Sequence, residues 1–170
     1  MLKPILEVRG LRKTFGAVVA ANNVNIDVCS GEIIGIIGAN GAGKTTFVNM
    51  VTGYLKPTAG SINFNGLELV GKLPREVTQN GISRSFQVSQ VFSTMTVADN
   101  LLMALAISEN RGSKAMRPMI NPSLIEKSEN ILERYQMIQY RDLVVSALSQ
   151  GVRKLLDIAM AVVSNPRILL

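Results

Sequence analysis

A glycine-rich segment constrains what this chain can fold into more than any other feature of its sequence. Residues 38–45 read Gly-Ala-Asn-Gly-Ala-Gly-Lys-Thr, which matches the pattern G-x-x-x-x-G-K-[ST] at every fixed position. The apolar run of residues 33–37 precedes the segment and predicts a central parallel strand covered on both faces. Residues 44–55 follow it, carry apolar side chains on one side of a helix and predict a helix that Lys56-Pro57 stops. Strand, loop and helix in this order predict a phosphate-binding unit.

The residue types of the loop explain why it would bind phosphate. Glycines allow a tight turn that aims successive N–H groups inward, and the start of the helix adds its positive dipole end. Lys44 would supply a positive charge for the outer phosphates, and Thr45 a hydroxyl for Mg²⁺. A glycine-rich turn with an incidental Lys-Thr pair is the alternative. The predicted nucleotide-binding residues are Gly38, Ala39, Asn40, Gly41, Ala42, Gly43, Lys44 and Thr45.

A second motif, Leu148-Ser149-Gln150-Gly151, stands at the start of the last predicted helix, which runs from about residue 150 to 163. A serine hydroxyl and bare glycine N–H groups at a helix N-terminus form another phosphate-binding surface. Serine is also an ordinary N-cap residue. Both interpretations of Ser149 stay open on the motif alone.

The remaining pattern predicts a layer of strands followed by helices. Alternating apolar residues predict strands near residues 6–8, 24–28 and 61–66. A short helix is predicted over residues 74–80, followed by a strand over 82–86. A capping box opens at Thr96, with Asp99 in place of the usual Glu, before an apolar helix over 101–107. A helix is predicted from Pro122 and a buried strand from residue 168. We expect one α/β domain over residues 1–170, with a helical subdomain inserted at about 91–147.

Composition excludes several classes of function. The chain has 18 Lys and Arg against 12 Asp and Glu, a net charge of +6, but no basic block, so we expect a solvated surface and no nucleic-acid partner. It has no histidine and one cysteine, which rules out an imidazole mechanism and an internal disulfide and suits a reducing, cytoplasmic compartment. Its longest apolar stretches are too short to cross a bilayer.

With both motifs in place, the sequence resembles the ATP-binding subunits of ABC transporters, and it is most similar to the ATPases of branched-chain amino-acid and urea importers. The resemblance covers all 170 residues. It implies a P-loop NTPase fold of the ABC ATPase type, with an N-terminal antiparallel β layer and a helical subdomain, C-terminally truncated. The segments that carry the resemblance are Phe15, Gly38–Thr46, Thr52–Gly60, Ser83–Gln87, Met95–Leu102 and Leu148–Ile158.

The resemblance also implies a role for individual residues. Phe15 would stack on the adenine of ATP, Thr46 would join the phosphate-binding loop, and Lys44 and Gln87 would serve catalysis. Gln87 would contact Mg²⁺, together with Thr45, and the attacking water. A core or surface aromatic remains the alternative for Phe15, and a polar strand end the alternative for Gln87.

Dimerisation and membrane partners follow from the same resemblance. Ser149 and Gly151 would contact the γ-phosphate bound to the opposite subunit of a head-to-tail dimer, homomeric or heteromeric. Transmembrane permease subunits would hold the protein at the inner face of the cell membrane. Two departures from the family pattern are Val152, where a Gln is usual, and Met160, where an Arg is common.

Family members continue past the segment that ends at Leu170 into a Mg²⁺-binding Asp, a catalytic Glu, a dimer-contact loop and a switch His. We therefore expect this chain to bind nucleotide better than it hydrolyses it, and to leave apolar edges exposed where a neighbouring strand would lie. A non-transport ABC ATPase and a noncatalytic nucleotide-binding remnant are the alternatives.

Overall fold

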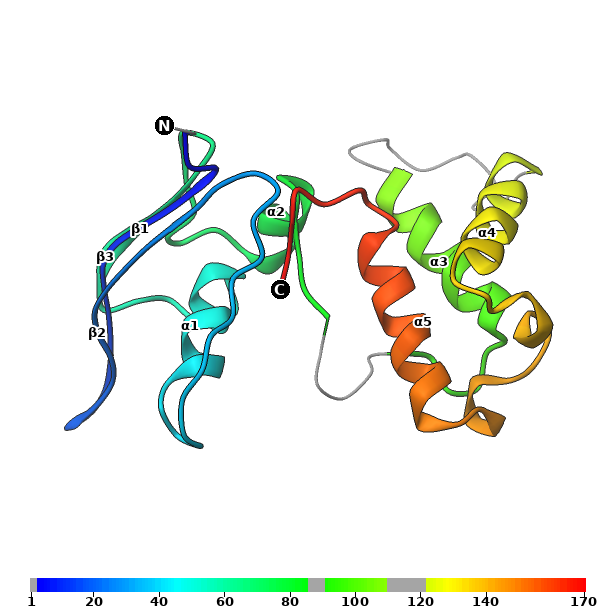
Figure 1. Ribbon diagram of the computed structural model, residues 1–170, viewed down its shortest axis with the longest axis horizontal. Coiled ribbons are helices and arrows are strands. Elements are labelled where there is room, and N and C mark those ends of the chain that lie inside the picture. The colour runs from blue at the N-terminus through cyan, green and yellow to red at the C-terminus, as the bar shows by residue number, and fades with distance from the viewer. Residues whose placement is uncertain (1–2, 86–90, 110–121) are drawn as a thin grey trace. The chain divides into compact units, whose positions relative to one another are not determined.

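The computed structural model describes residues 3–85, 91–109 and 122–170 (Figure 1). The chain divides into two compact units, Met1–Asn80 and Gly81–Leu170. Each unit has its own elements and its own buried side chains.

The first unit is built on an antiparallel sheet with the strand order β2-β1-β3-β4. The strands are β1 (Leu6–Phe15), β2 (Val18–Val28), β3 (Ala59–Phe64) and β4 (Leu67–Glu68). Strands β1 and β2 form a hairpin in which Phe15 faces Val18 across the ladder. A hydrogen-bonded ion pair joins Arg9 to Asp27, and this hydrogen bond raises the pKa of Arg9. The N-terminal strand layer predicted from alternating residues is confirmed.

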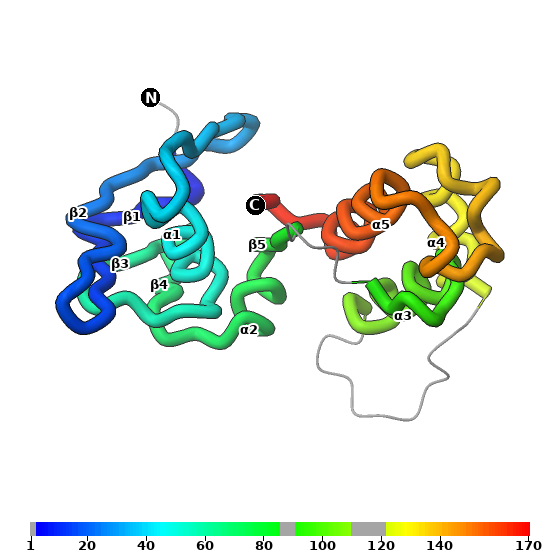
Figure 2. Tube along the Cα trace, turned by 90° about the horizontal axis from the view of Figure 1, so that it is seen from below, coloured from blue at the N-terminus to red at the C-terminus, as the bar shows by residue number. Residues whose placement is uncertain are grey.

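Two helices of the first unit lie beside this sheet, α1 (Lys44–Val51) and α2 (Pro74–Gln79) (Figures 1 and 2). Helix α1 buries Phe47, Met50 and Val51. It ends at Val51, so the prediction of a helix to residue 55 was wrong. The reason is Gly53, whose φ of 77° is incompatible with a continuing helix. Gly53 also packs against the backbone of residues 72–74, where a Cβ would stand 2.8 Å from the Lys72 carbonyl oxygen.

The apolar run before the loop does not form the central strand that its composition predicts. No β-ladder in the described parts of the chain includes residues 33–37, and Ile33 and Ile37 are 99% and 97% exposed. An extended segment becomes a stable strand only when a neighbour accepts and donates its backbone hydrogen bonds. None of the described segments does so here. The prediction of a covered strand was wrong, whereas the expectation of exposed apolar edges is confirmed at these two residues.

The second unit combines a two-stranded parallel sheet with helices. Its strands pair Ile82 with Ile168 and Ser83 with Leu169, which confirms a short strand near each predicted position. Its elements are β5 (Ile82–Ser83), α3 (Val97–Glu109), α4 (Pro122–Arg134), the 3₁₀ turns η1 (Ile138–Tyr140) and η2 (Val145–Ala147), α5 (Gln150–Val162) and β6 (Ile168–Leu169). Helices α3 and α4 fall within the range 91–147. The assignment of that range as an inserted subdomain of a single domain stays a prediction.

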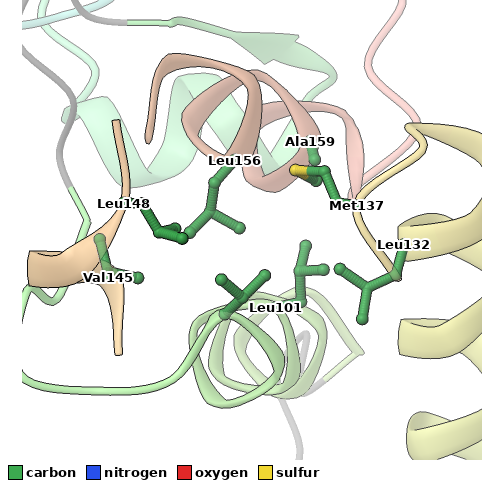
Figure 3. Close-up of a cluster of buried hydrophobic side chains, with 8 residues drawn as sticks. Leu101, Leu132, Met137, Val145, Leu148, Leu156 and Ala159 are labelled. Atoms are coloured by element: carbon green, nitrogen blue, oxygen red, sulfur yellow. The ribbon is translucent and has the colours of Figure 1, made fainter. Parts of the chain in front are cut away.

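A buried apolar cluster holds the helices of the second unit together (Figure 3). Leu101 of α3 and Leu156 of α5 point toward each other across it, and both are fully buried. Its members are Val97, Leu101, Leu132, Met137, Val145, Leu148, Leu156 and Ala159. Leu148, the first residue of the second motif, therefore anchors the start of α5 to this core.

The predicted capping box opens α3. The Asp99 N–H donates to Thr96 Oγ1 at 3.1 Å, and the Thr96 N–H donates to Asp99 Oδ2 at 3.4 Å. The two residues thus satisfy each other's free donors at the helix start. This element confirms that Asp can replace Glu in the box.

Candidate functional site

The glycine-rich loop is held in place by its contact with β2. Gly43 is the residue before α1 and has a φ of 82°, in the left-handed region where glycine is favoured. A Cβ built on Gly43 would stand 2.1 Å from the carbonyl oxygen of Ala20. Gly41 also has a positive φ, 85°, but a Cβ there would meet no atom within 4 Å. Gly43 is therefore required twice over, by its backbone conformation and by the close approach of β2.

The start of α1 presents backbone donors at the loop. The Phe47 N–H donates to the Gly43 carbonyl at 2.8 Å and closes the first helical turn. The first N–H groups of any helix lack partners within the helix, and no acidic side chain stands in the first turn of α1. The positive end of the helix dipole is thus left for an anion.

Lys44 lies over its own loop. Its Nζ donates to the Gly38 carbonyl at 2.5 Å and to the Ala39 carbonyl at 2.8 Å. Ala39 also accepts from the Ala42 N–H at 3.1 Å, which closes the turn. The structure thus places the charge of Lys44 against the loop backbone. The oxygens of a phosphate bound in the loop would replace these two carbonyls as hydrogen-bond acceptors for the Lys44 ammonium.

The hydroxyl residues after the lysine offer little to a metal ion by themselves. Thr45 is exposed at the first turn of α1 and Thr46 is half-buried. Within the described residues, no group of His, Cys, Asp and Glu side chains could hold a metal ion. Mg²⁺ commonly binds through few protein ligands plus phosphate oxygens and waters, so the residues fit Mg²⁺ bound together with a nucleotide. Gln87, the other predicted ligand, lies outside the described residues.

A hollow of about 270 Å³ lies between the loop and β2. Val19 and Ala20 line it from the strand, and Ala42, Gly43 and Lys44 line it from the loop. Phe15 stands near this hollow, because it faces Val18, two residues before Ala20 on β2. Two strand residues span roughly 7 Å, a short distance compared with the length of a nucleoside triphosphate.

Phe15 has the exposure expected of a stacking surface. Its side chain is 50% exposed at the end of β1, which makes it a surface aromatic and not a core residue. The ammonium of Lys13 lies 5.1 Å from the centroid of its ring. Sequence reasoning missed Lys13, although its spacing of two residues along a strand places both side chains on one face.

The second motif caps α5. Ser149 is the N-cap residue, and its Oγ accepts from the Val152 N–H at 3.4 Å. Gly151 is exposed, with open space where a Cβ would stand. Both residues belong to the second unit and Phe15 and the loop to the first. The capping role of Ser149 is present in this structure, and a phosphate contact of the same hydroxyl stays a prediction.

Three further side chains of α5 make polar contacts within the second unit, and none of these contacts was expected from the sequence. Arg153 donates to the carbonyls of Leu148 at 2.9 Å and Ser146 at 2.8 Å. The buried Asp157 accepts from the Ser85 hydroxyl at 3.0 Å and pairs with the Lys154 ammonium at 3.2 Å. The spacing of three between Lys154 and Asp157 was the available signal for the ion pair.

The two departures from the family pattern have a structural explanation. Val152 and Met160 are both partly buried and pack against the apolar cluster of the second unit. A polar Gln or a charged Arg in the same contacts would lose hydration. Here the two apolar side chains add to the core.

Comparison with known proteins identifies the family. The sequence model of the family described as "ABC transporter" matches residues 21–170. The chain is 35% identical to the high-affinity branched-chain amino acid transport ATP-binding protein LivG of Escherichia coli K12, with 100% of this chain and 69% of that protein covered. It is also 35% identical to the corresponding protein BraF of Pseudomonas aeruginosa, with the same coverage.

Solved structures agree with this result. The structure described as the ADP conformation of MJ1267, an ATP-binding cassette of an ABC transporter, has a TM-score of 0.84 and 33% identity. The alignment covers 98% of this chain and 67% of that one. A nucleotide-free ATP-binding cassette from an ABC transporter has a TM-score of 0.81 and 33% identity. The predicted α/β class, a P-loop NTPase of the ABC ATPase type, is confirmed, and the chain belongs to the ABC transporter family.

Proposed function

We propose that this chain is the ATP-binding subunit of an ABC importer that couples ATP binding and hydrolysis to the transport of branched-chain amino acids or a similar small solute. The observation that carries the proposal is the Gly38–Thr45 loop, with the Lys44 ammonium over it and the first turn of α1 beneath it. The similar proteins of Escherichia coli and Pseudomonas aeruginosa are named as branched-chain amino acid transport proteins, which supports the choice of solute.

Different residues of the proposed site bind different parts of the nucleotide. Loop N–H groups and Lys44 bind the phosphates, and binding replaces the Lys44 bonds to Gly38 and Ala39 by contacts to phosphate oxygens. Thr45 and Gln87 are the proposed protein ligands of Mg²⁺. When bound, the ion would neutralise developing charge on the β- and γ-phosphates. Phe15 stacks on the base.

The second unit serves a nucleotide on another subunit. Ser149 and Gly151 at the start of α5 donate toward the γ-phosphate held by a second ABC ATPase subunit in a head-to-tail dimer. Lys44 and Gln87 are the proposed catalytic residues for the nucleotide of this chain's own loop. Arg153, which holds Leu148 and Ser146, keeps the start of α5 in register for that contact.

The site of action would be the inner face of the cell membrane. In the described parts of the chain, no helix is both long and apolar enough to cross a membrane. Transmembrane permease subunits would supply the pathway and attach this chain to the bilayer. No nucleic-acid partner is proposed, because the net charge of +6 forms no basic block.

The first test is nucleotide binding by the purified chain, measured by isothermal titration with ATP and Mg²⁺. We expect Lys44→Ala to weaken ATP binding by about ten- to a hundredfold, since a hydrogen bond to a charged group contributes about 1.5–3 kcal/mol. Lys72→Ala, which removes a lysine from the same unit outside the loop, is the matched control and should bind like the parent. Equal affinity of Lys44→Ala and the parent would rule out the loop as the site.

The second test concerns transport. Cells that lack the chain should lose uptake of labelled leucine or of a related small solute, and the parent should restore it. Lys44→Ala should not. Uptake restored in full by Lys44→Ala would contradict the coupling of transport to this loop.

A further inference from the structure

We propose that Lys13 is a positioning residue that holds the ring of Phe15 for stacking on the base of the nucleotide. The inference rests on the proposed ATP site and adds a residue to it. It starts from a contact on the surface of the first unit, where a half-buried lysine meets a half-exposed aromatic ring.

The lysine and the ring meet on one face of β1. Residues two apart along a strand point to the same side, and the Lys13 Nζ lies 5.1 Å from the centroid of Phe15. A cation within about 6 Å of a ring centroid is attracted by the negative face of the ring. The contact therefore restrains the orientation of a side chain that would otherwise rotate freely at the end of a strand.

A second contact fixes the ammonium itself. The Lys13 Nζ donates to the main-chain carbonyl of Lys56 at 2.7 Å. The segment that carries this carbonyl is tied to β1 on both sides of Lys13. The Thr58 N–H donates to the Arg12 carbonyl at 2.8 Å, and the Thr14 N–H donates to Thr58 Oγ1 at 3.1 Å. Lys13 thus bridges a rigid backbone acceptor and the ring.

This arrangement prepares the ring for a purine. The ammonium occupies one face of Phe15 and draws electron density toward itself, which leaves the opposite face less repulsive to the electron-rich π-system of a base. Ordering the ring before binding also removes part of the entropy cost of ordering it on binding. Lys13 acts through Phe15 in this way, without touching the nucleotide.

The test compares two ligands, ATP and inorganic triphosphate, because only ATP carries a base. Dissociation constants are measured for the parent, Lys13→Met, Lys13→Arg, Phe15→Ala and the Lys13→Met/Phe15→Ala double variant. Lys13→Met should weaken ATP binding about two- to fivefold, the size expected for an exposed cation–ring contact, and leave triphosphate binding unchanged. Lys13→Arg keeps a cation and a donor and should bind ATP like the parent.

Two comparisons separate this mechanism from a general effect of charge. In the Phe15→Ala background, Lys13→Met should cause no further loss of ATP affinity. Lys56→Met removes an equal charge nearby but keeps the carbonyl that anchors Lys13, and it should not change ATP binding.

The inference is overturned if Lys13→Met binds ATP like the parent, if it weakens ATP and triphosphate equally, or if its effect persists without Phe15. A parent chain that binds no ATP would overturn the proposed function itself. A parent that binds ATP, with any of the first three results, would leave the proposed function intact and remove only the role of Lys13.

Discussion

Replacement of Gly43 by Ala is the change for which the structure allows the clearest estimate. Two penalties combine at this residue. An L-residue at a φ of 82° costs about 1–2 kcal/mol. The new Cβ would also stand 2.1 Å from the Ala20 carbonyl oxygen, far inside contact distance, so either the loop or β2 must move. Forcing an extra methyl group into a packed region costs about 1–3 kcal/mol more. We expect Gly43→Ala to lower the free energy of unfolding by about 2–5 kcal/mol.

Gly41→Ala is the matched control, because Gly41 shares the backbone conformation but not the contact. Its φ is 85° and a Cβ there would meet no atom within 4 Å, so only the conformational cost of about 1–2 kcal/mol applies. Urea unfolding followed by circular dichroism measures both variants. Titration with ATP should show a loss of about tenfold or more for Gly43→Ala, because the displaced loop loses hydrogen bonds to phosphate. If Gly43→Ala lost no more stability than Gly41→Ala, the argument that β2 holds the loop would fail.

Two other changes test the structure at a distance from the loop. Thr96→Ala removes the side-chain acceptor for the Asp99 N–H and should cost about 1 kcal/mol of stability in urea unfolding. The control Thr94→Ala, on the exposed turn before Thr96, should cause no measurable loss of stability. Equal losses for the two variants would argue against the capping box. Ile33→Lys should change stability by less than about 0.5 kcal/mol, because Ile33 is 99% exposed. A loss of about 2–5 kcal/mol, typical of a buried aliphatic residue, would instead support the prediction of a covered strand over residues 33–37.

Local signals in the sequence predicted the features that depend on a few neighbouring residues. Alternation along residues 24–28 predicted part of β2, and the spacing of Thr96 and Asp99 predicted the capping box. The loop motif predicted a tight glycine turn directly before a helix. Each of these patterns is short, so the residues that decide it stand close together in the chain.

Features that depend on distant partners were missed or predicted wrongly. Whether residues 33–37 form a strand depends on a neighbour elsewhere in the chain, and composition cannot say whether that neighbour is present. The end of α1 depends on how Gly53 packs against the backbone of residues 72–74. The cluster of Ser85, Lys154 and Asp157 joins segments far apart in the sequence.

The sequence by itself determined which groups are available in the proposed phosphate site: glycines, a lysine and a threonine follow one another in residues 38–45, so backbone N–H groups, a positive charge and a hydroxyl lie close together. Only the tertiary structure decided how that chemistry is held. It set Ala20 of β2 against Gly43 and gave the Lys13 ammonium the carbonyl of Lys56 as an acceptor. The contacts of Gly43 with Ala20 and of Lys13 with Lys56 join segments far apart in the chain, because backbone hydrogen bonds and buried apolar area bring those segments together.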